Sequence, residues 1–171
     1  MNKRLLITGC SGGGKSTLLE ALKRQGFTVV CEPGLRVIKG SGPKPWDDRR
    51  GFIEAVVKMS HADLEKAAAQ TGPVFFDRGI FDALSGLAKI EGFSLAELMP
   101  SVFPYAEPVF FAPPWPEIFE RTEERPHCFE FALEESERLK RDLNLLAVKT
   151  LVLPKLNVDQ RVAFVMHQLS D

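Results

Sequence analysis

The residues best suited to do chemistry lie near the start of the chain, in the segment from Gly9 to Thr17. The segment fits the pattern G-x-x-x-x-G-K-[ST], in which glycines let successive backbone N–H groups curl around phosphate oxygens. In such loops the lysine, here Lys15, reaches the β- and γ-phosphates, and the following hydroxyl, here Ser16, is a magnesium ligand. The segment therefore predicts a site for ATP, or alternatively GTP, together with Mg²⁺. The residues expected to hold the nucleotide are Gly9, Ser11, Gly12, Gly13, Gly14, Lys15, Ser16 and Thr17.

The elements around this segment decide whether the pattern is meaningful, because a match this short also arises by chance. Residues 4–8 are a nearly continuous apolar run, as expected of a parallel strand covered on both faces. After the glycines, Leu18 and Leu22 fall on one helical face, and the helix is predicted to stop at Gly26. Its N-terminus would place the positive end of the helix dipole beneath the phosphates. The order of strand, turn and helix is the one that a phosphate loop requires.

A second candidate group is Asp77, which ends the apolar run VFFD. Parallel strands of such sheets end on the ligand side, so Asp77 should face the metal ion and the phosphates. We expect it to hold magnesium through water and to polarise the acceptor; the alternative is a cap for a helix beginning near Ile80. Arg78 would bind an anionic group of the substrate. Asp82 would bind the acceptor or face solvent.

Glu32 is a third candidate, at the end of a strand predicted over residues 27–31. A carboxylate there would lie across the cleft from the γ-phosphate, where a hydroxyl acceptor needs a general base. Arg36, four residues later, would clamp the acceptor or form an ion pair with Glu32 that only shapes the loop. Either Glu32 or Asp77 would serve as the base.

Two arginines four residues apart, Arg121 and Arg125, are predicted on a helix that begins at Pro116. Arginines that close over the phosphates would neutralise the charge that develops during phosphoryl transfer. We expect Arg125 to play this catalytic part. For Arg121 the alternative is a surface pair with Glu117.

The rest of the chain alternates between predicted strands and helices, which indicates an α/β fold with a parallel sheet covered on both faces. Its length of 171 residues suits one domain, 1–171. The remaining strands are predicted over residues 74–76, 109–111 and 150–153. The remaining helices are predicted after an Asp47 cap to about Gln70, from a Ser94–Glu97 capping box, over 129–146, and after an Asn157 cap.

The segment from Glu32 to Trp46 is rich in glycine and proline and is predicted to be an irregular loop. Trp46 would anchor this loop, or alternatively stack on a base. The adenine site is expected after the fifth strand, near Lys155.

Composition excludes several classes of protein. With 22 basic and 23 acidic residues, no overall charge indicates a nucleic acid or an acidic membrane as partner. The three cysteines are widely spaced, which argues against a disulfide framework and a zinc site. The N-terminal apolar run is too short for a signal peptide or a membrane span, so a cytoplasmic protein is expected. Nothing in the sequence indicates the oligomeric state.

Four strings carry a resemblance that covers most of the chain, from about Lys3 to Gln168: LLITGCSGGGKSTLLEAL, CEPGLRVI, GPVFFDRGIFDAL and FFAPPWPEIFERTEER. Together they resemble a family of small P-loop ATPases that are labelled AAA-type but belong structurally with nucleoside and nucleotide kinases. The kinase domain of nicotinamide-riboside kinase/adenylyltransferase proteins is a relative. The resemblance implies a three-layer P-loop NTPase sandwich with a five-stranded parallel sheet of order 2-3-1-4-5. It also implies a helical lid at about residues 115–130 that contains Arg121 and Arg125.

The resemblance further implies Glu32 and Arg36 near the acceptor and Asp77 near the metal. CEPG is similar to a loop of thymidylate kinases in which an arginine precedes the glutamate. Cys31 occupies that place here, which argues against a nucleoside monophosphate as acceptor. AAA+ motors end a hydrophobic strand in Asp-Glu, whereas this chain has Asp77-Arg78, so a remodelling motor is not expected.

The leading hypothesis is therefore a small-molecule kinase that moves the γ-phosphoryl group of ATP to a nucleoside-like or nucleotide-like acceptor. The alternative is a nucleotide-dependent switch, or a slow NTPase, that acts through a protein partner. A GTPase normally carries an Asn-Lys-x-Asp-like string after a strand, and the post-strand segments PPWP and PKLN do not fit it.

Overall fold

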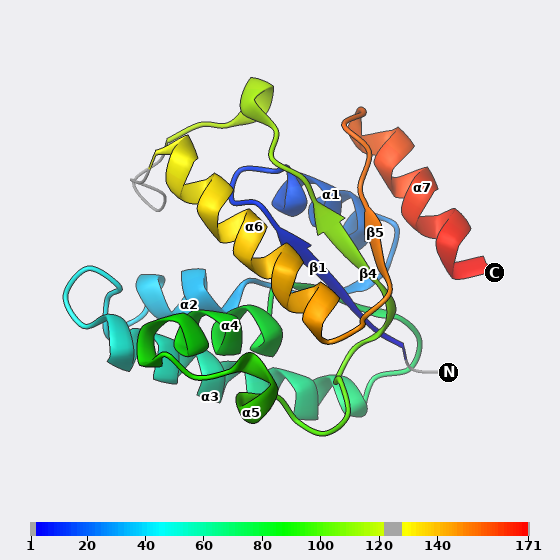
Figure 1. Ribbon diagram of the computed structural model, residues 1–171. Coiled ribbons are helices and arrows are strands. Elements are labelled where there is room, and N and C mark those ends of the chain that lie inside the picture. Colours follow the sequence, from blue (N-terminus) through cyan, green and yellow to red (C-terminus); the bar gives the residue numbers. More distant parts are fainter. Residues whose placement is uncertain (1–2, 122–127, 171) are drawn as a thin grey trace.

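The computed structural model describes residues 3–121 and 128–170 (Figure 1). The strands are β1 (Arg4–Gly9), β2 (Thr28–Val30), β3 (Val74–Asp77), β4 (Ala106–Ala112) and β5 (Thr150–Val152). The helices are α1 (Lys15–Arg24), α2 (Pro33–Lys39), α3 (Arg49–Ala68), α4 (Ile80–Glu91), α5 (Leu95–Leu98), α6 (Phe129–Leu145) and α7 (Val158–Ser170), with a 3₁₀ turn, η1 (Pro116–Ile118). In this part of the chain, no helix is long and apolar enough to cross a membrane.

The strands form one sheet in the order β2-β3-β1-β4-β5, which confirms the predicted order. All four pairings are parallel. Ile7 of β1 pairs with Asp77 of β3, and Gly9 pairs with Ala112 of β4. Because the strands run in one direction, the segments that follow β1, β2, β3 and β4 meet at one edge of the sheet.

Helices cover both faces of this sheet, and successive residues of each strand point to opposite faces. Leu6 packs in one cluster beneath α3, α4 and α6, whereas Leu5 and Ile7 pack in the other beneath α1 and α7. Every one of these three side chains is fully buried. The central strand is therefore covered from both sides, which is why its sequence is continuously apolar instead of alternating.

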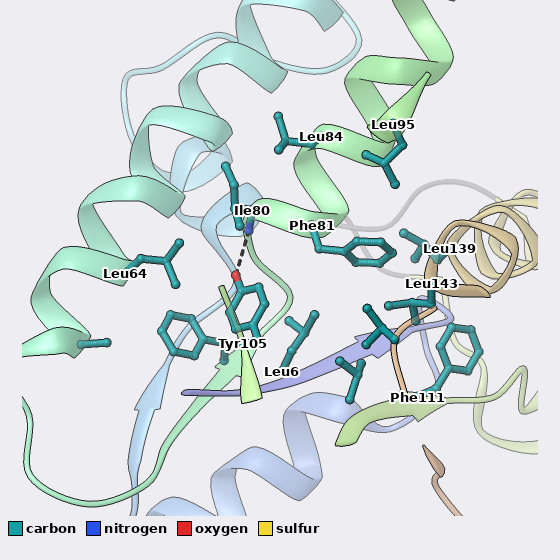
Figure 2. Close-up of a cluster of buried hydrophobic side chains, with 14 of the residues drawn as sticks. Leu6, Leu64, Ile80, Phe81, Leu84, Leu95, Tyr105, Phe111, Leu139 and Leu143 are labelled. Carbon is teal, nitrogen blue, oxygen red and sulfur yellow. Dashed lines mark hydrogen bonds between the residues drawn. The ribbon is translucent and has the colours of Figure 1, made fainter. Parts of the chain in front are cut away.

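A buried tyrosine supports the start of α4. The hydroxyl oxygen of Tyr105 accepts a hydrogen bond of 3.0 Å from the backbone nitrogen of Ile80 (Figure 2). A Cβ atom on Gly79 would lie 2.0 Å from that hydroxyl, so only glycine fits between β3 and α4. Burial raises the pKa of Tyr105 well above its ordinary value. The neutral phenol thus fixes the turn that carries Arg78 toward the site.

Two predictions for the segment between residues 32 and 49 are wrong. Residues 33–39 are not irregular loop but helix α2, because Pro33 at its first position fixes the backbone at a helical φ. The cap of α3 is Asp48 and not Asp47, since the Asp48 side chain accepts from the backbone nitrogen of Gly51 at 2.8 Å. In the predicted Ser94–Glu97 capping box, the Glu97 side chain accepts from the backbone nitrogen of Ser94 at 3.0 Å, and at the predicted Asn157 cap the side chain accepts from the backbone nitrogen of Gln160 at 3.0 Å.

The helix predicted to begin at Pro116 is only the turn η1, which stops at Ile118. Phe119 then adopts extended backbone, and its ring packs edge-on against Phe129 at 5.1 Å. This aromatic contact competes with continued helix. Arg121 is exposed and outside any helix, and Arg125 lies outside the described residues.

Candidate active site

The phosphate loop joins β1 to α1. Gly9 has φ +110° and Gly14 has φ +73°, values that side-chain-bearing residues rarely adopt. A Cβ atom on Gly9 would also lie 2.3 Å from the carbonyl oxygen of Ala112 on the neighbouring strand. The backbone nitrogen of Cys10 donates to that same oxygen at 2.9 Å. The loop therefore curls tightly over the end of β4, as phosphate binding requires.

Lys15 lies within this loop and is 6% exposed. Its ammonium donates to the carbonyl oxygens of Cys10 at 2.8 Å and Gly9 at 3.4 Å. Burial, and secondarily the charge of Arg78, lower the pKa of Lys15 below its ordinary value. An ammonium has three protons, so these two bonds leave one for an anionic ligand.

Ser16 and Asp77 form the candidate magnesium site. The Ser16 hydroxyl donates to Asp77 Oδ2 at 3.4 Å. Asp77 Oδ1 is buried and has no hydrogen-bond partner among the described residues. Burial raises the pKa of Asp77, and the nearby charges of Lys15 and Arg78 oppose that shift. An unsatisfied carboxylate oxygen beside a hydroxyl fits Mg²⁺, which binds through one or two protein oxygens and completes its shell with phosphate and water.

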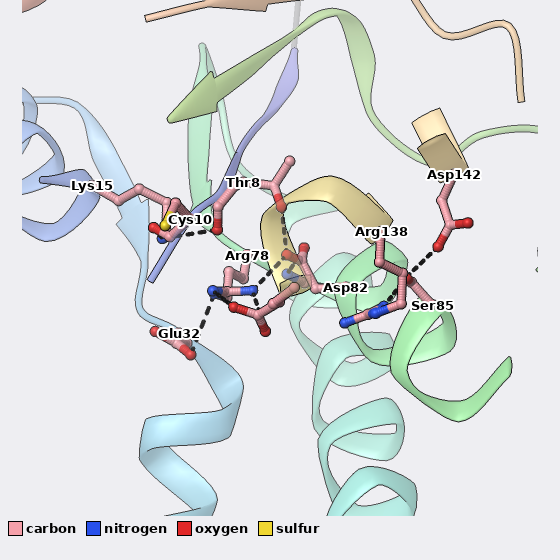
Figure 3. Close-up of polar contacts among 12 residues, drawn as sticks. Thr8, Cys10, Lys15, Glu32, Arg78, Asp82, Ser85, Arg138 and Asp142 are labelled. Atoms are coloured by element: carbon pink, nitrogen blue, oxygen red, sulfur yellow. Dashed lines mark hydrogen bonds and ion pairs between the residues drawn. The ribbon is translucent and has the colours of Figure 1, made fainter. Parts of the chain in front are cut away.

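Arg78 stands at the centre of a buried charge network (Figure 3). Its guanidinium makes two hydrogen bonds to Glu135, of 2.7 and 3.2 Å. It also lies 3.2 Å from Asp82 Oδ1 and 3.6 Å from Glu32 Oε1. Although burial opposes it, the pKa of Arg78 stays well above its ordinary value because of Glu135, Glu32 and Asp82. Three carboxylates thus satisfy the arginine that the sequence assigned to an anionic substrate group.

The backbone of Arg78 is strained, with φ +57° in the left-handed region. Such a conformation costs about 1–3 kcal/mol in a residue other than glycine. The ion pairs with Glu135 and Asp82 hold it in place.

Asp82 lies in the first turn of α4 and contacts Thr8 of β1. It accepts from the Thr8 hydroxyl through a short hydrogen bond and from the backbone nitrogen of Gly79 at 3.1 Å. The N-cap of α4 is Gly79, whose backbone nitrogen is satisfied by Asp82 at the third helical position, and the alternative that Asp77 caps this helix is wrong. The alternative that Asp82 faces solvent is also wrong, because its side chain is 8% exposed. Burial raises the pKa of Asp82, opposed by Arg78 and by the Thr8 bond.

Glu32 occupies the N-cap position of α2, at the edge of the same network. Its side chain is 26% exposed. Burial raises its pKa, and Arg78 partly opposes the shift. Arg36 turns away and pairs with Asp63 of α3, with one bond of 3.2 Å and a second, shorter contact. The Glu32–Arg36 pair considered from the sequence is therefore replaced by an Arg36–Asp63 pair.

Two cavities, each of about 400 Å³, meet at Ser11 and Glu32, which line both. The first cavity, here called the acceptor pocket, lies among α2, α3, α4 and α6 and includes Trp46 in its wall. Trp46 is 60% exposed, so it does not anchor its loop. The second, here called the nucleotide pocket, is lined by residues of the phosphate loop from Ser11 to Thr17, other than Gly13, and by residues that follow β4 and β5. Those additional residues are Trp115, Ile118, Glu120, Leu156, Val158 and Arg161.

Arg161 of α7 is a site residue that no sequence motif indicated. Its guanidinium donates to the carbonyl oxygens of Gly14 at 2.9 Å and Gly13 at 3.2 Å. It also lies over the ring of Trp115, 5.6 Å from the centroid. Arg161 is 3% exposed, and burial lowers its pKa. It therefore fastens the phosphate loop from beneath and forms one wall of the nucleotide pocket.

Glu135 was missed as well, although the sequence held a signal. The buried face of α6 contains Ala132, Ser136, Leu139 and Leu143. Glu135 is one turn beyond Ala132, beside this face, where a carboxylate needs a buried partner. Arg78 is that partner, and it lowers the pKa of Glu135 against the effect of burial.

Comparisons with known proteins agree with this architecture. Residues 4–161 match a protein family described as AAA domain. No curated protein matches the sequence. Similar solved structures include deoxyadenosine kinase from M. mycoides with the products dCMP and a flexible dCDP bound (TM-score 0.65, 17% identity, 98% of each chain). The deoxyadenosine kinase with dATP bound has TM-score 0.60 at 17% identity, covering 98% of this chain and all of the other.

Thymidylate kinase from Ehrlichia chaffeensis is another similar structure, with TM-score 0.60 and 14% identity over 99% of this chain and 98% of the other. At these identities the likeness shows the fold alone. It confirms the kinase-like P-loop fold, and with the AAA-domain match it confirms the resemblance found in the sequence.

Proposed function

Because the chain belongs to this AAA-domain family of P-loop proteins, we propose that it is a magnesium-dependent kinase with ATP as its phosphoryl donor. The γ-phosphoryl group would pass to a hydroxyl of a nucleoside-like acceptor. The observation that carries this proposal is the pair of cavities, of about 400 Å³ each, that meet at Ser11 and Glu32. A switch or an NTPase needs only the nucleotide pocket, whereas a kinase needs a second pocket that opens onto the γ-phosphate.

Glu32 is the general base in this proposal. The acceptor oxygen attacks the γ-phosphorus, the bond from that phosphorus to the β,γ-bridging oxygen breaks, and the acceptor proton passes to a Glu32 carboxylate oxygen. A carboxylate whose pKa is raised accepts a proton more readily, and burial raises that of Glu32. Arg78, 3.6 Å from Glu32, keeps the carboxylate directed into the cleft.

Charge neutralisation at the phosphates falls to the other groups. Lys15 would contact the β- and γ-phosphates, and Ser16 and Asp77 would hold Mg²⁺. The bound ion would supply positive charge to the phosphate oxygens in the transition state. Arg121 and Arg125 would neutralise charge on the transferring group. Catalysis would then rest mainly on positioning and electrostatics.

The charges near Glu32 favour a neutral hydroxyl acceptor over a nucleoside monophosphate. The guanidinium of Arg78 is already paired with Glu32, Asp82 and Glu135. An acceptor phosphate at this position would meet three carboxylates and one satisfied cation. Like charges held close together are unfavourable in a partly buried site.

The test is ADP release from Mg-ATP by the full chain, with a panel of nucleosides and nucleoside monophosphates and a no-acceptor control. Stimulation by a nucleoside supports the kinase. If ATP or GTP binds and no acceptor stimulates release, the protein is a switch or slow NTPase that acts through a protein partner.

A further inference from the structure

The acceptor pocket has opposite charges at its two ends. At the end that meets the nucleotide pocket, Arg78 is surrounded by the carboxylates of Glu32, Asp82 and Glu135. The other end is lined by Arg49 and Lys89, while Arg138 lies between the two ends and Glu134 is the acidic side chain in this part of the lining. The end beside the γ-phosphate is thus net acidic, and the far end is net basic.

The spacing of residues along α4 gives the distance between the acidic end and the basic end of the acceptor pocket. Asp82, Gly86 and Lys89 line one side of the pocket in that order. Seven residues of helix separate Asp82 from Lys89, a rise of about 10 Å. Arg50, at the start of α3, lies 3.5 Å from Glu91 at the end of α4, so Arg49 is also at the far end. This length is comparable to that of a nucleoside.

Arg138 lies between the two ends and is held in place. It is one turn beyond Glu135 on α6, and it donates to the hydroxyl of Ser85 through a short hydrogen bond. Ser85 in turn donates to Asp142. Burial lowers the pKa of Arg138, and its Nε atom is buried without a hydrogen-bond partner among the described residues. The side chain is therefore a positioned cation with hydrogen-bonding capacity left over.

Lys89 and Arg49 are exposed cations that have no ion-pair partner within residues 3–121 and 128–170. Their neighbour Arg50, by contrast, is paired with Glu54 and Glu91. The basic end of the pocket thus has charge available to a ligand.

The walls between the two ends are apolar. The side chains of Trp46, Phe52 and Phe131 line the pocket, with Ile53 opposite Gly86. A flat ring fits between aromatic walls, and an aromatic contact contributes about 0.5–1.5 kcal/mol beyond its buried area.

We propose that the acceptor is a ring compound with its reacting hydroxyl at one end and a carboxylate at the other. This inference rests on the proposed kinase function and narrows its substrate class. The hydroxyl lies beside Glu32, the ring lies between the aromatic walls, and the carboxylate accepts from Arg138 and Lys89. A ring whose far edge offers only N–H donors leaves these cations without a partner.

Two ribosides test this directly, because nicotinic acid riboside and nicotinamide riboside differ only in carboxylate against carboxamide. Isothermal titration calorimetry of each riboside, and kcat/KM with Mg-ATP, are measured on the full chain. A charge-assisted hydrogen bond is about twice as strong as a neutral one, so the acid should be favoured about tenfold or more. Lys89→Gln and Arg138→Gln should each bring the ratio of acid to amide, in affinity and in kcat/KM, toward one. Lys140→Gln and Arg141→Gln, exposed on α6 and outside the pocket lining, should leave it unchanged.

Binding and turnover separate the two proposals. If the acid binds preferentially, and Lys89→Gln removes the preference, the pocket assignment stands even where no phosphoryl transfer follows. Turnover of the amide at an equal or higher kcat/KM keeps the kinase and overturns the inference. A preference unchanged in both variants, or no binding of the acid, also overturns it. Because Lys89 is exposed, its variant remains informative if Arg138→Gln fails to fold.

Discussion

The hydroxyl of Ser16 lies 3.4 Å from Oδ2 of Asp77, although the two residues are 61 positions apart in the chain. The sheet makes this contact, because β1 and β3 are adjacent and parallel and Ile7 pairs with Asp77. The other oxygen of Asp77 is buried and has no partner in the part of the chain that the structure describes. A buried acceptor left unsatisfied costs about 1–3 kcal/mol, which a bound cation would recover.

Asp77→Asn should lower magnesium-dependent turnover about 100-fold or more while changing ATP affinity less than tenfold, because metal charge matters most in the transition state. Turnover and nucleotide affinity are measured across a Mg²⁺ titration, with Asp47→Asn as the exposed control. Equal loss of turnover and affinity, together with a lower melting temperature, would mean that Asp77 has a structural part instead.

The same variant has a predicted pH signature in ligand-free protein. The pKa of Asp77 is raised in the folded state, so the folded protein binds this proton more tightly than the unfolded chain. Its stability contribution therefore falls as pH rises from the ordinary carboxyl range through the folded pKa. The asparagine of the Asp77→Asn variant cannot ionise. The melting temperature of the variant should therefore rise relative to that of the unmodified protein as pH increases over this interval. A difference independent of pH would contradict the shift.

Much of the fold followed from sequence because each central strand is a continuous apolar run between turn residues. The phosphate loop was equally readable, since its glycines and Lys15 have fixed spacing. The Arg78 network was not readable, because Glu135 and Glu32 reach it from α6 and from the start of α2. The role of Arg161 could not be predicted for the same reason, because Arg161 is 147 residues from Gly14, the phosphate-loop residue to which it donates. The position of Glu135 beside the buried face of α6 indicates a buried partner, but the local sequence does not identify that partner.

Glu32→Gln should reduce phosphoryl transfer strongly, by about 100-fold or more, while ATP still binds. In the unmodified protein, burial raises the pKa of Glu32, so the acidic limb of the kcat/KM profile should lie above the ordinary glutamate value of 4.5. Activity then rises with pH as Glu32 loses its proton. The variant should lose this limb, and a profile that keeps it would assign the base to another group.

Lys15→Met should weaken ATP binding about 100-fold, since the charge-assisted hydrogen bonds to the phosphates are lost. The apolar chain of methionine fills most of the buried space, so circular dichroism should be unchanged. Lys23→Met is the matched control, because Lys23 is an exposed lysine on the same helix. Unchanged ATP affinity in Lys15→Met would refute the phosphate-loop assignment.

Arg161→Lys should weaken nucleotide binding about tenfold. Lysine keeps the charge but lacks the planar guanidinium that donates to the carbonyl oxygens of Gly13 and Gly14 at the same time. Trp115 reports on this region, so nucleotide titrations are followed by fluorescence in a Trp46→Phe background. Arg141→Lys, on exposed α6 surface, should bind as the unmodified protein does. An affinity unaffected by Arg161→Lys would show that the loop holds its shape without this clamp.

The most direct test of the kinase proposal is the fate of the γ-phosphoryl group. The full chain is incubated with Mg-ATP labelled at the γ-phosphorus and with the acceptor that best stimulates ADP release, and the label is divided by chromatography between acceptor and inorganic phosphate. The account predicts that most label lies on the acceptor and that Glu32→Gln abolishes this transfer. Label found only in inorganic phosphate, at a rate the acceptor does not change, would contradict it.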